Sequence, residues 1–243
     1  MSEELLSLRM LLVGASKTEC ALWAQGAGRA SVPIEFYTHD PEHSAMPKGG
    51  VDIFIVDASL SPAAMAAIVQ TARSLRPPPL VIVCGGSAAD RPHGVDGVIP
   101  RPAVVDDARR VTDLCIRAKL PNRVLIVDDS STMRSIVRKI LLASRFRLEI
   151  EESSDGPSAL EQVRSGRFGI VFVDYNMPEF NGIDTLKEIR RQHEDVAVVM
   201  ITSSLDAALQ DRALAAGAFA FLKKPFYPAD IDAILECYYG LSA

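Results

Sequence analysis

Five polar residues in the second half of the sequence stand at or just beyond the ends of apolar runs of strand length. They are Asp128, Asp129, Asp174, Thr202 and Lys224. The carboxyl ends of parallel strands meet at one edge of a sheet, so we expect these side chains to converge there. Three crowded carboxylates repel one another and raise each other's pKa unless a cation joins them. Hard oxygen ligands of this kind suit Mg²⁺, which also binds phosphate oxygens.

A site of this composition predicts transfer of a phosphoryl group. Asp174 can act as a nucleophile toward phosphorus and form an acyl phosphate. Catalysis of such a transfer is mostly positioning and charge neutralisation, for which Mg²⁺ and Lys224 would supply positive charge. Thr202 can donate a hydrogen bond to a phosphoryl oxygen. A hydrolase with an Asp nucleophile would want a second carboxylate two residues further on, where this sequence has Asn176.

The elements that must position these residues alternate regularly along the second half. Apolar runs of strand length and amphipathic segments with helical spacing follow one another five times. Strands are predicted at Val124–Val127, Leu148–Glu151, Ile170–Val173, Val196–Ile201 and Ala218–Leu222. Helices are predicted at Ser131–Ala143, Pro157–Ser165, Ile183–Gln192, Ala207–Ala216 and Ala229–Tyr239. Parallel strands need crossover connections, so this alternation indicates an α/β fold with a parallel sheet covered on both faces.

The first half shows the same alternation more loosely. Strands are predicted at Arg9–Val13, Pro33–Phe36, Ile53–Val56, Leu80–Cys84 and Gly97–Ile99. Helices are predicted at Thr18–Ala27, Ala63–Leu75 and Val104–Lys119. The segments where a second and a fourth helix would stand, His39–Gly50 and Gly85–Gly94, are rich in Gly, Pro and His and are interpreted as loops.

The chain therefore looks like two copies of one fold, of which the first is degraded. A period near half the chain length indicates a tandem duplication rather than a solenoid. The predicted join is Leu120-Pro121-Asn122, which gives domains at residues 1–120 and 121–243.

Four segments of the second half together carry a family resemblance. They are VLIVDDSSTMR (Val124–Arg134), VDYNMPEFNGID (Val173–Asp184), Ile201-Thr202-Ser203 and FLKKPF (Phe221–Phe226). These segments closely resemble the receiver domains of two-component response regulators, from Arg123 to about Leu241. The resemblance implies that each half is a flavodoxin-like (βα)5 receiver domain, a doubly wound five-stranded parallel sheet.

The resemblance also implies a role for each residue of the site. Asp174 is the phospho-acceptor, and Lys224 contacts the phosphoryl group. Asp128, Asp129 and Asp174 bind Mg²⁺ together with the backbone carbonyl of Asn176. Thr202 and Phe221 form a switch pair, and the peptide bond between Lys224 and Pro225 is cis, as X–Pro bonds can be.

The first half departs from this pattern. Gly14 and Ala15 stand where the carboxylates of the acidic pocket should be, although Asp57 matches the acceptor position. Gly85 stands near the hydroxyl position, Val98 at the aromatic position, and Arg101 replaces the lysine. Without its pocket Asp57 should hold Mg²⁺ poorly, so this half resembles a pseudo-receiver with a structural or partner-binding role.

Composition and charge limit the function classes. The 243 residues are 48% hydrophobic and 23% charged, a globular balance with room for two domains. The net charge of −5 argues against a broad nucleic-acid surface. The N-terminal apolar stretch is too short for a signal peptide, and no apolar run approaches the ~20 residues that span a bilayer. A cytoplasmic protein without membrane contact is the expectation.

The principal functional hypothesis is a phosphorylation-dependent binding switch. A histidine kinase or a histidine phosphotransfer protein would donate the phosphoryl group, and a downstream protein effector would read the changed surface. The protein would not be an enzyme beyond its own phosphorylation and dephosphorylation, and a phosphorylation-dependent homodimer is left open. Two alternatives stay open as well: a phosphorelay intermediate or phosphate sink, and the regulatory part of a longer protein such as a diguanylate cyclase.

Overall fold

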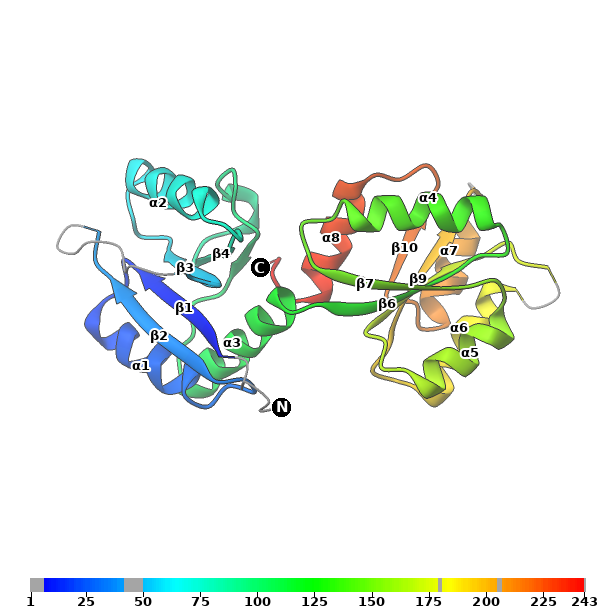
Figure 1. Ribbon diagram of the computed structural model, residues 1–243, viewed down its shortest axis with the longest axis horizontal. Helices are drawn as coiled ribbons and strands as arrows, with labels where there is room; N and C mark the ends of the chain where they lie inside the picture. The colour runs from blue at the N-terminus through cyan, green and yellow to red at the C-terminus, as the bar shows by residue number, and fades with distance from the viewer. Residues whose placement is uncertain (1–6, 42–49, 179–180, 205–206, 243) are drawn as a thin grey trace. The chain divides into compact units, whose positions relative to one another are not determined.

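The computed structural model describes residues 7–41, 50–178, 181–204 and 207–242, and shows two five-stranded parallel sheets (Figure 1). By contact between backbones the chain groups into two compact units. The first unit is Met1–Leu120 with Glu236–Ala243, and the second unit is Pro121–Leu235. This grouping differs from the predicted one in its treatment of Glu236–Ala243, and the domain boundaries at 1–120 and 121–243 stay a prediction.

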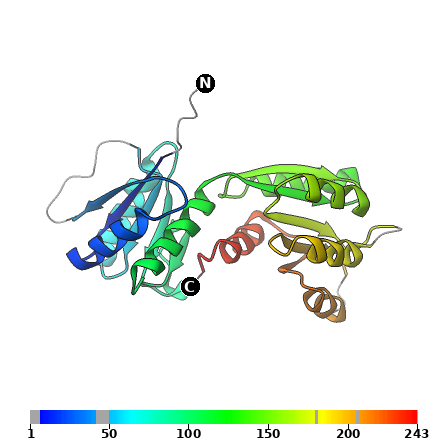
Figure 2. The same cartoon turned by 90° about the horizontal axis from the view of Figure 1, so that it is seen from below.

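The first unit contains five strands in the order β2-β1-β3-β4-β5, all parallel. The strands are β1 (Leu8–Val13), β2 (Ile34–His39), β3 (Ile53–Asp57), β4 (Leu80–Cys84) and β5 (Gly97–Ile99). The helices are α1 (Lys17–Ala27), α2 (Pro62–Ser74) and α3 (Val105–Lys119), with one 3-10 turn at Ala88–Asp90. Helices α1 and α3 lie side by side on one face of the sheet, and α2 covers the other (Figures 1 and 2).

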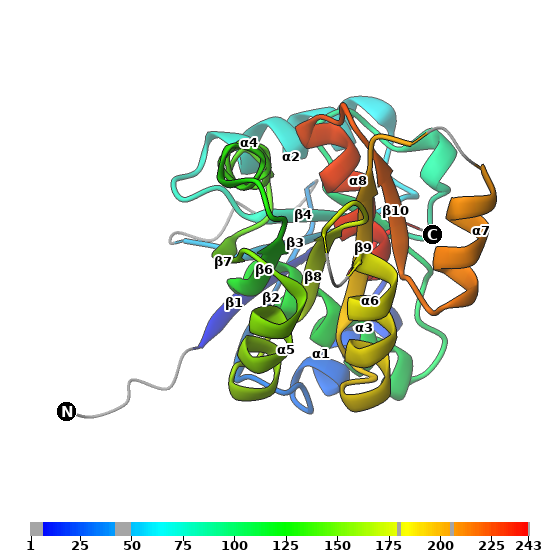
Figure 3. The ribbon, with the colours of Figure 1, turned by 90° about the vertical axis from the view of Figure 1, so that its right-hand side faces the viewer.

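The second unit repeats this order as β10-β9-β8-β6-β7. Its strands are β6 (Asn122–Val127), β7 (Leu148–Ser153), β8 (Ile170–Asp174), β9 (Ala197–Thr202) and β10 (Ala220–Lys223). Its helices are α4 (Ser131–Leu142), α5 (Gly156–Ser165), α6 (Gly182–Gln192), α7 (Ala207–Ala215) and α8 (Pro228–Tyr238). Figure 3 shows α4 and α8 on one side of the sheet, with α5 and α6 on the other.

Side-chain caps at the helix starts explain where several of these helices begin. Ser16, Ser61, Ser130, Asp155 and Asn181 each accept a hydrogen bond from a backbone N–H of the following first turn. Such caps satisfy donors that have no partner inside the helix. Each capped helix follows a strand, so the cap also fixes the turn that leaves the carboxyl edge of the sheet.

The central strands are almost wholly apolar because both of their faces are covered. Every residue of β3, β4, β8 and β9 is buried. Strands β2 and β7 alternate between more and less exposed residues, as expected where a strand lies at a sheet edge. This contrast places the rigid centre of each sheet under the strand ends that carry Asp57 and Asp174.

The predicted α/β fold with two doubly wound parallel sheets is confirmed. Four strand limits were wrong by two residues or more: β6 begins at Asn122 rather than Val124, β7 ends at Ser153 rather than Glu151, and β2 and β10 differ as follows. Strand β2 extends to His39 rather than Phe36, because its pairing with β1 continues through Thr38 and His39. Strand β10 begins at Ala220 rather than Ala218, after a turn in which Gly217 has a φ of +95°.

The loop predicted at Gly85–Gly94 contains only the 3-10 turn, so α2 is the one described helix on its face of the first sheet. Most of the other predicted loop, His39–Gly50, lies outside the described residues. None of the described helices is both long and apolar enough to cross a membrane.

Candidate functional site

The carboxylates predicted to converge do so at the carboxyl edge of the second sheet. Asp128 follows β6 and Asp174 ends β8, and both side chains are buried, whereas Asp129 is exposed. One carboxylate oxygen from each of the three lies within 4.8 Å of the others. Asp128 is held in place by a hydrogen bond that its Oδ1 accepts from the backbone N–H of Ser130, at 2.9 Å.

Lys224 supplies the counter-charge for the two buried carboxylates. Its Nζ lies 2.8 Å from Oδ1 of Asp174 and 3.2 Å from Oδ2 of Asp128. The backbone places it there, because the Lys224 N–H donates to the Thr202 carbonyl at 2.7 Å. The predicted cis peptide bond between Lys224 and Pro225 is present.

Burial and ion pairing act in opposite directions on the pKa values of Asp174 and Lys224. Burial raises the pKa of Asp174 above its ordinary value, although the hydrogen bond and charge of Lys224 act to lower it. Burial works to lower the pKa of Lys224, but Asp174 and Asp128 outweigh burial and the Lys224 pKa is raised. Lys224 is therefore fully charged at neutral pH, and Asp174 is a carboxylate whose charge burial disfavours.

The remaining predicted residues lie around this cluster. Thr202 ends β9 fully buried, and its Oγ1 accepts a hydrogen bond from the Ser204 N–H at 3.1 Å. Phe221 lies in β10 opposite Met200 of β9 and packs, half-buried, against the core. Asn176 is exposed just beyond β8. The metal-binding role of its carbonyl and the switch role of Thr202 and Phe221 stay predictions.

Two further residues support the site and were not singled out for it from the sequence. A Cβ at Gly182 would lie 2.3 Å from the carbonyl oxygen of Asp174, so only glycine allows α6 to start this close to the acceptor strand. Arg134 of α4 donates to the Asp128 carbonyl at 2.9 Å and pairs with Glu152 at 3.1 Å. The Asn-Gly pair at 181–182 was a visible signal, whereas nothing in the spacing of Arg134 pointed to the site.

The corresponding edge of the first sheet is arranged differently. Asp57 is buried at the end of β3, and its Oδ1 accepts from the Arg101 guanidinium at 2.9 Å and from the Ser59 N–H at 2.8 Å. Arg101 also pairs with Glu19 of α1. The positive charge beside Asp57 and Glu19 is therefore supplied by the chain itself, through Arg101.

The cluster of Asp57, Arg101 and Glu19 also leaves no room for an acidic pocket beside Asp57. Gly14 has a φ of +79°, and a Cβ there would meet the Leu60 side chain at 2.7 to 2.9 Å. Glu19 is held by a capping box in which Ser16 and Glu19 bond to each other's backbone N–H. Hydrogen bonds from Ser16 and the charge of Arg101 lower the Glu19 pKa. The Ser-x-x-Glu spacing at 16–19 was the signal that could have identified Glu19.

Comparison with known proteins agrees with this geometry. The family model described as response regulator receiver domain matches residues 124–236. Chemotaxis protein CheY-3 of Vibrio cholerae serotype O1 is 39% identical over 116 residues, which cover 47% of this chain and 88% of the relative. This chain belongs to the response regulator receiver family.

Two further comparisons extend the receiver assignment. The cyclic di-GMP phosphodiesterase response regulator RpfG of Xanthomonas campestris pv. campestris is 30% identical over 138 residues, 56% of this chain and 36% of that protein. A solved structure titled probable two-component system response regulator/GGDEF domain protein covers 95% of this chain and 99% of its own, with 23% identity and a TM-score of 0.53. At that identity the likeness concerns the fold, and it agrees with two successive flavodoxin-like receiver domains in this chain.

Proposed function

We propose that the second unit accepts a phosphoryl group on Asp174 and signals through protein–protein contact. The observation that carries this proposal is the position of the Lys224 ammonium, within 3.2 Å of both buried carboxylates, Asp128 and Asp174. A lysine in this place can neutralise an incoming phosphoryl group at the moment when Asp174 is esterified.

The donor is a phosphohistidine on a histidine kinase or a histidine phosphotransfer protein. A carboxylate oxygen of Asp174 attacks the phosphorus, a P–O bond forms and the P–N bond to the imidazole breaks. The imidazole nitrogen keeps the electron pair and takes up a proton, and the product is an acyl phosphate. The acyl phosphate carries the negative charge of its phosphoryl oxygens, and the Lys224 ammonium beside Asp174 is placed to offset that charge.

The residues present fit Mg²⁺. Asp128, Asp129 and Asp174 offer three carboxylate oxygens in one small region, and Asp129 is exposed enough to receive an ion from solvent. Oxygen-only donor sets with room for water are those that Mg²⁺ prefers. When bound, the ion would neutralise phosphoryl oxygens alongside Lys224.

The output is a surface change read by a downstream protein effector, with no direct nucleic-acid or membrane contact and a cytoplasmic location. Thr202 bonds the new phosphoryl group, and Phe221 repacks as Thr202 moves, in a two-state shift biased by a local charge. The half-buried position of Phe221, at the boundary of the core, gives it room to adopt a second arrangement. A homodimer formed on phosphorylation is one form that this output can take.

The first unit is a pseudo-receiver that does not accept phosphate. Arg101 already pairs with Asp57 and Glu19, and Leu60 fills the space beside Gly14. An incoming phosphoryl donor would have to displace the Arg101 guanidinium from the buried Asp57 carboxylate, and Gly14 and Ala15 offer no carboxylate to hold a metal in its place, so Asp57 serves structure here.

The test is loading with Mg²⁺ and beryllofluoride, a mimic of the phosphoryl group, followed by native mass spectrometry. One adduct per chain is expected for the native protein and for Asp57→Asn, and none for Asp174→Asn. These two variants are matched, because each removes one buried carboxylate at the end of an equivalent strand. The same spectra report whether loading changes the oligomeric state.

Two results would contradict the proposal. An adduct that survives Asp174→Asn means that Asp174 is not the acceptor. Loss of the adduct in Asp57→Asn means that the first unit takes part in loading and is not a pseudo-receiver.

Two alternatives within the receiver family remain as competing proposals. If Asp174 passes its phosphoryl group back to a phosphotransfer histidine faster than it hydrolyses, the protein is a relay intermediate or a phosphate sink. If the chain is the regulatory part of a longer protein, its output is an attached domain. The match to 36% of a cyclic di-GMP phosphodiesterase response regulator favours testing that second alternative on the full reading frame.

A further inference from the structure

The first sheet is extended at its β5 edge by residues from the far end of the sequence. Val98 of β5 donates its backbone N–H to the Leu241 carbonyl at 2.7 Å. Val98 and Ser242 form a parallel bridge. An extended segment that bonds to a sheet edge in this way uses the pairing by which edge strands capture peptides.

The β5 edge is shaped to receive this segment. A Cβ at Gly97 would lie 2.6 Å from the Leu241 Cβ and 2.7 Å from its carbonyl oxygen, so the close approach requires glycine at this position. Leu241 and Tyr239 are both fully buried. Val98 is also buried, so the hydrogen bond between Val98 and Leu241 is shielded from water.

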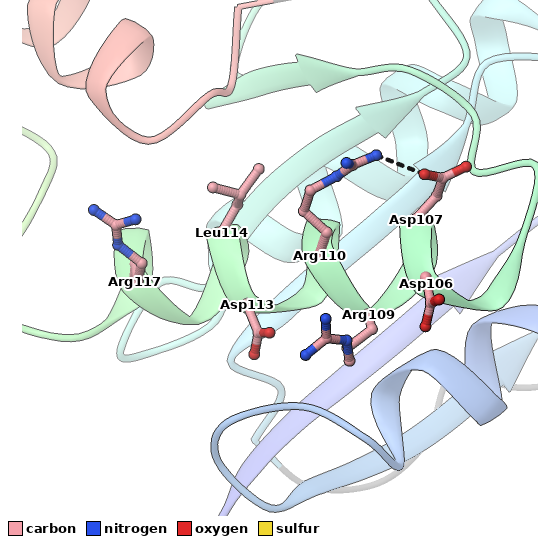
Figure 4. Close-up of a pocket in the computed structure, with 7 residues that line it drawn as sticks. All are labelled: Asp106, Asp107, Arg109, Arg110, Asp113, Leu114 and Arg117. Atoms are coloured by element: carbon pink, nitrogen blue, oxygen red, sulfur yellow. Dashed lines mark hydrogen bonds and ion pairs between the residues drawn. The ribbon is translucent and has the colours of Figure 1, made fainter.

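Side-chain contacts flank the backbone pairing. Arg91 forms an ion pair with Glu236 at 2.6 Å, and the Arg117 guanidinium lies over the Tyr238 ring, 5.2 Å from its centroid. Leu114 projects from the same side of α3 as Arg110 and Asp107 (Figure 4). A Cβ at Gly240 would lie 3.2 Å from Leu114, so this leucine closes the space beside the turn.

The place that residues 236–242 occupy at the β5 edge is called the seat below. The chain enters it directly from helix α8. Gly240 has a φ of +65°, and the N–H groups of Gly240 and Leu241 bond to the carbonyls of Cys237 and Glu236. This glycine turn ends the helix and directs Leu241 to β5. Helix α8 therefore begins in the second unit and ends in the first.

We propose that residues 236–242 are an intramolecular ligand of the first unit, and that phosphorylation of Asp174 releases them from β5. The second part rests on the proposed function. Lys224 contacts Asp174 at 2.8 Å, and α8 begins shortly after it and leads to the segment that pairs with β5. Loading draws Lys224 to the phosphoryl group, and Lys224 precedes α8 by a few residues. A shift of Lys224 on loading would be passed along α8 to residues 236–242, and this is the proposed route of release.

The seat is tested on the full chain without any phosphoryl mimic. The measurement is hydrogen exchange of the Val98 amide, resolved by nuclear magnetic resonance. Leu241→Asp should speed this exchange by about tenfold or more, because a carboxylate is expelled from the buried seat. Ser242→Ala is the matched control, since it changes an exposed side chain and leaves the backbone bridge intact.

A second variant changes the β5 side of the same contact. Gly97→Ala adds only a methyl group, which would meet Leu241 at less than van der Waals distance, and it should also speed Val98 exchange. The fluorescence of Trp23, the sole tryptophan of the chain and buried in α1, verifies that the first unit stays folded in each variant. Unchanged protection of the Val98 amide in both variants would overturn the proposal that residues 236–242 bind the β5 edge.

Coupling is tested by adding Mg²⁺ and beryllofluoride. Val98 exchange should speed up in the native chain and stay unchanged in Asp174→Asn. By reciprocity, Leu241→Asp should load at about a fivefold lower beryllofluoride concentration than the native chain or Ser242→Ala. Loading without any change at Val98 would overturn the release while leaving the proposed function intact. Failure of the native chain to load would instead overturn the proposed function and, with it, the release, and the seat would still be decided by the unloaded variants.

Discussion

A single lysine pairs with both buried carboxylates of the candidate site. Lys224 stands between Asp174 and Asp128, two carboxylates that are otherwise buried together at the ends of neighbouring strands. Two like charges in a low-dielectric place strongly disfavour each other's ionised form. The folded second unit therefore depends on Lys224 for stability as well as for chemistry.

Replacing this lysine should separate the two roles. In the presence of a chelator, Lys224→Met should destabilise the second unit by about 2 kcal/mol, because it leaves buried carboxylates without a cation. Added Mg²⁺ should raise the melting temperature of this variant by more than that of the native chain, since the ion then takes over the missing charge. Calorimetry with and without Mg²⁺ measures both effects. Equal Mg²⁺ shifts in the two proteins would contradict this account of the charge balance.

The Glu19 carboxylate of the first unit should make a pH-dependent contribution to the stability of the folded chain. Its pKa is lowered from 4.5 in the folded chain, so it stabilises the fold above that pH and the contribution is lost as pH falls through the lowered value. Glu19→Gln should cost about 1 kcal/mol at pH 7 and almost nothing in strong acid. Denaturant titration followed by Trp23 fluorescence measures the cost. Glu35→Gln, which disrupts an exposed ion pair with Arg9, should cost less than Glu19→Gln at pH 7.

The residues of the second-unit site were predictable from the sequence because each directly follows or ends an apolar run. Strand ends in a parallel sheet meet at one edge, so order along the chain was enough to place Asp128, Asp174 and Lys224 together. Glu19 was different. Its pairing with Arg101 joins the first turn of α1 to the loop after β5, and the packing that brings these two segments together is not encoded in local spacing.

At the scale of elements, the start of α6 carries the tightest constraint. The Gly182 N–H donates to the Tyr175 carbonyl at 3.2 Å, and the glycine backbone lies directly against the acceptor strand. Asn181 caps the same helix by accepting from the N–H groups of Ile183 and Asp184. The pair Asn181-Gly182 therefore sets the distance between α6 and Asp174.

Enlarging this glycine should disturb the acceptor strand. Gly182→Ala should destabilise the second unit by about 2–3 kcal/mol, because the new methyl would meet the Asp174 carbonyl oxygen at 2.3 Å. Beryllofluoride loading should weaken in parallel. Gly28→Ala is a suitable control, since its nearest neighbour would lie 3.4 Å away, at ordinary contact distance. A Gly182→Ala protein as stable as the control would contradict the tight approach.

Element type was predictable throughout the described part of the chain, whereas several strand limits were not. The extension of β2 to His39 depends on pairing with β1, which polar edge residues such as Thr38 do not announce. The late start of β10 depends on the turn at Gly217. Three of the four larger errors, those in β2, β7 and β10, concern edge strands, where one neighbour rather than two defines the strand and the hydrophobic signal is correspondingly weaker.

At the scale of the whole molecule, the two units have separate cores and should respond separately to ligand. Mg²⁺ with beryllofluoride should raise the unfolding midpoint of the second unit, as any ligand that binds only the folded state does. It should not raise that of the first unit. Trp23 fluorescence reports the first unit alone, and calorimetry reports both. A rise in the Trp23-detected midpoint would place the ligand in the first unit.

The membership of Glu236–Ala243 in the first unit could not be predicted from the sequence. Tyr239 and Leu241 continue the apolar pattern of the last helix, and nothing local distinguishes a residue that packs on its own unit from one that reaches β5. The signal lay instead at Gly97, a glycine inside a strand, which commonly marks a place where another backbone approaches closely.

Arg101 gives the first unit a positive charge at Asp57 that does not depend on a bound metal ion. A guanidinium fixed to the chain is present at one equivalent per molecule, whatever the composition of the surrounding solution, whereas an ion held by Asp128, Asp129 and Asp174 would exchange with it. Chelators and fluctuations in magnesium supply should therefore act directly on one half of the molecule only. Any response common to both halves would have to travel along the polypeptide.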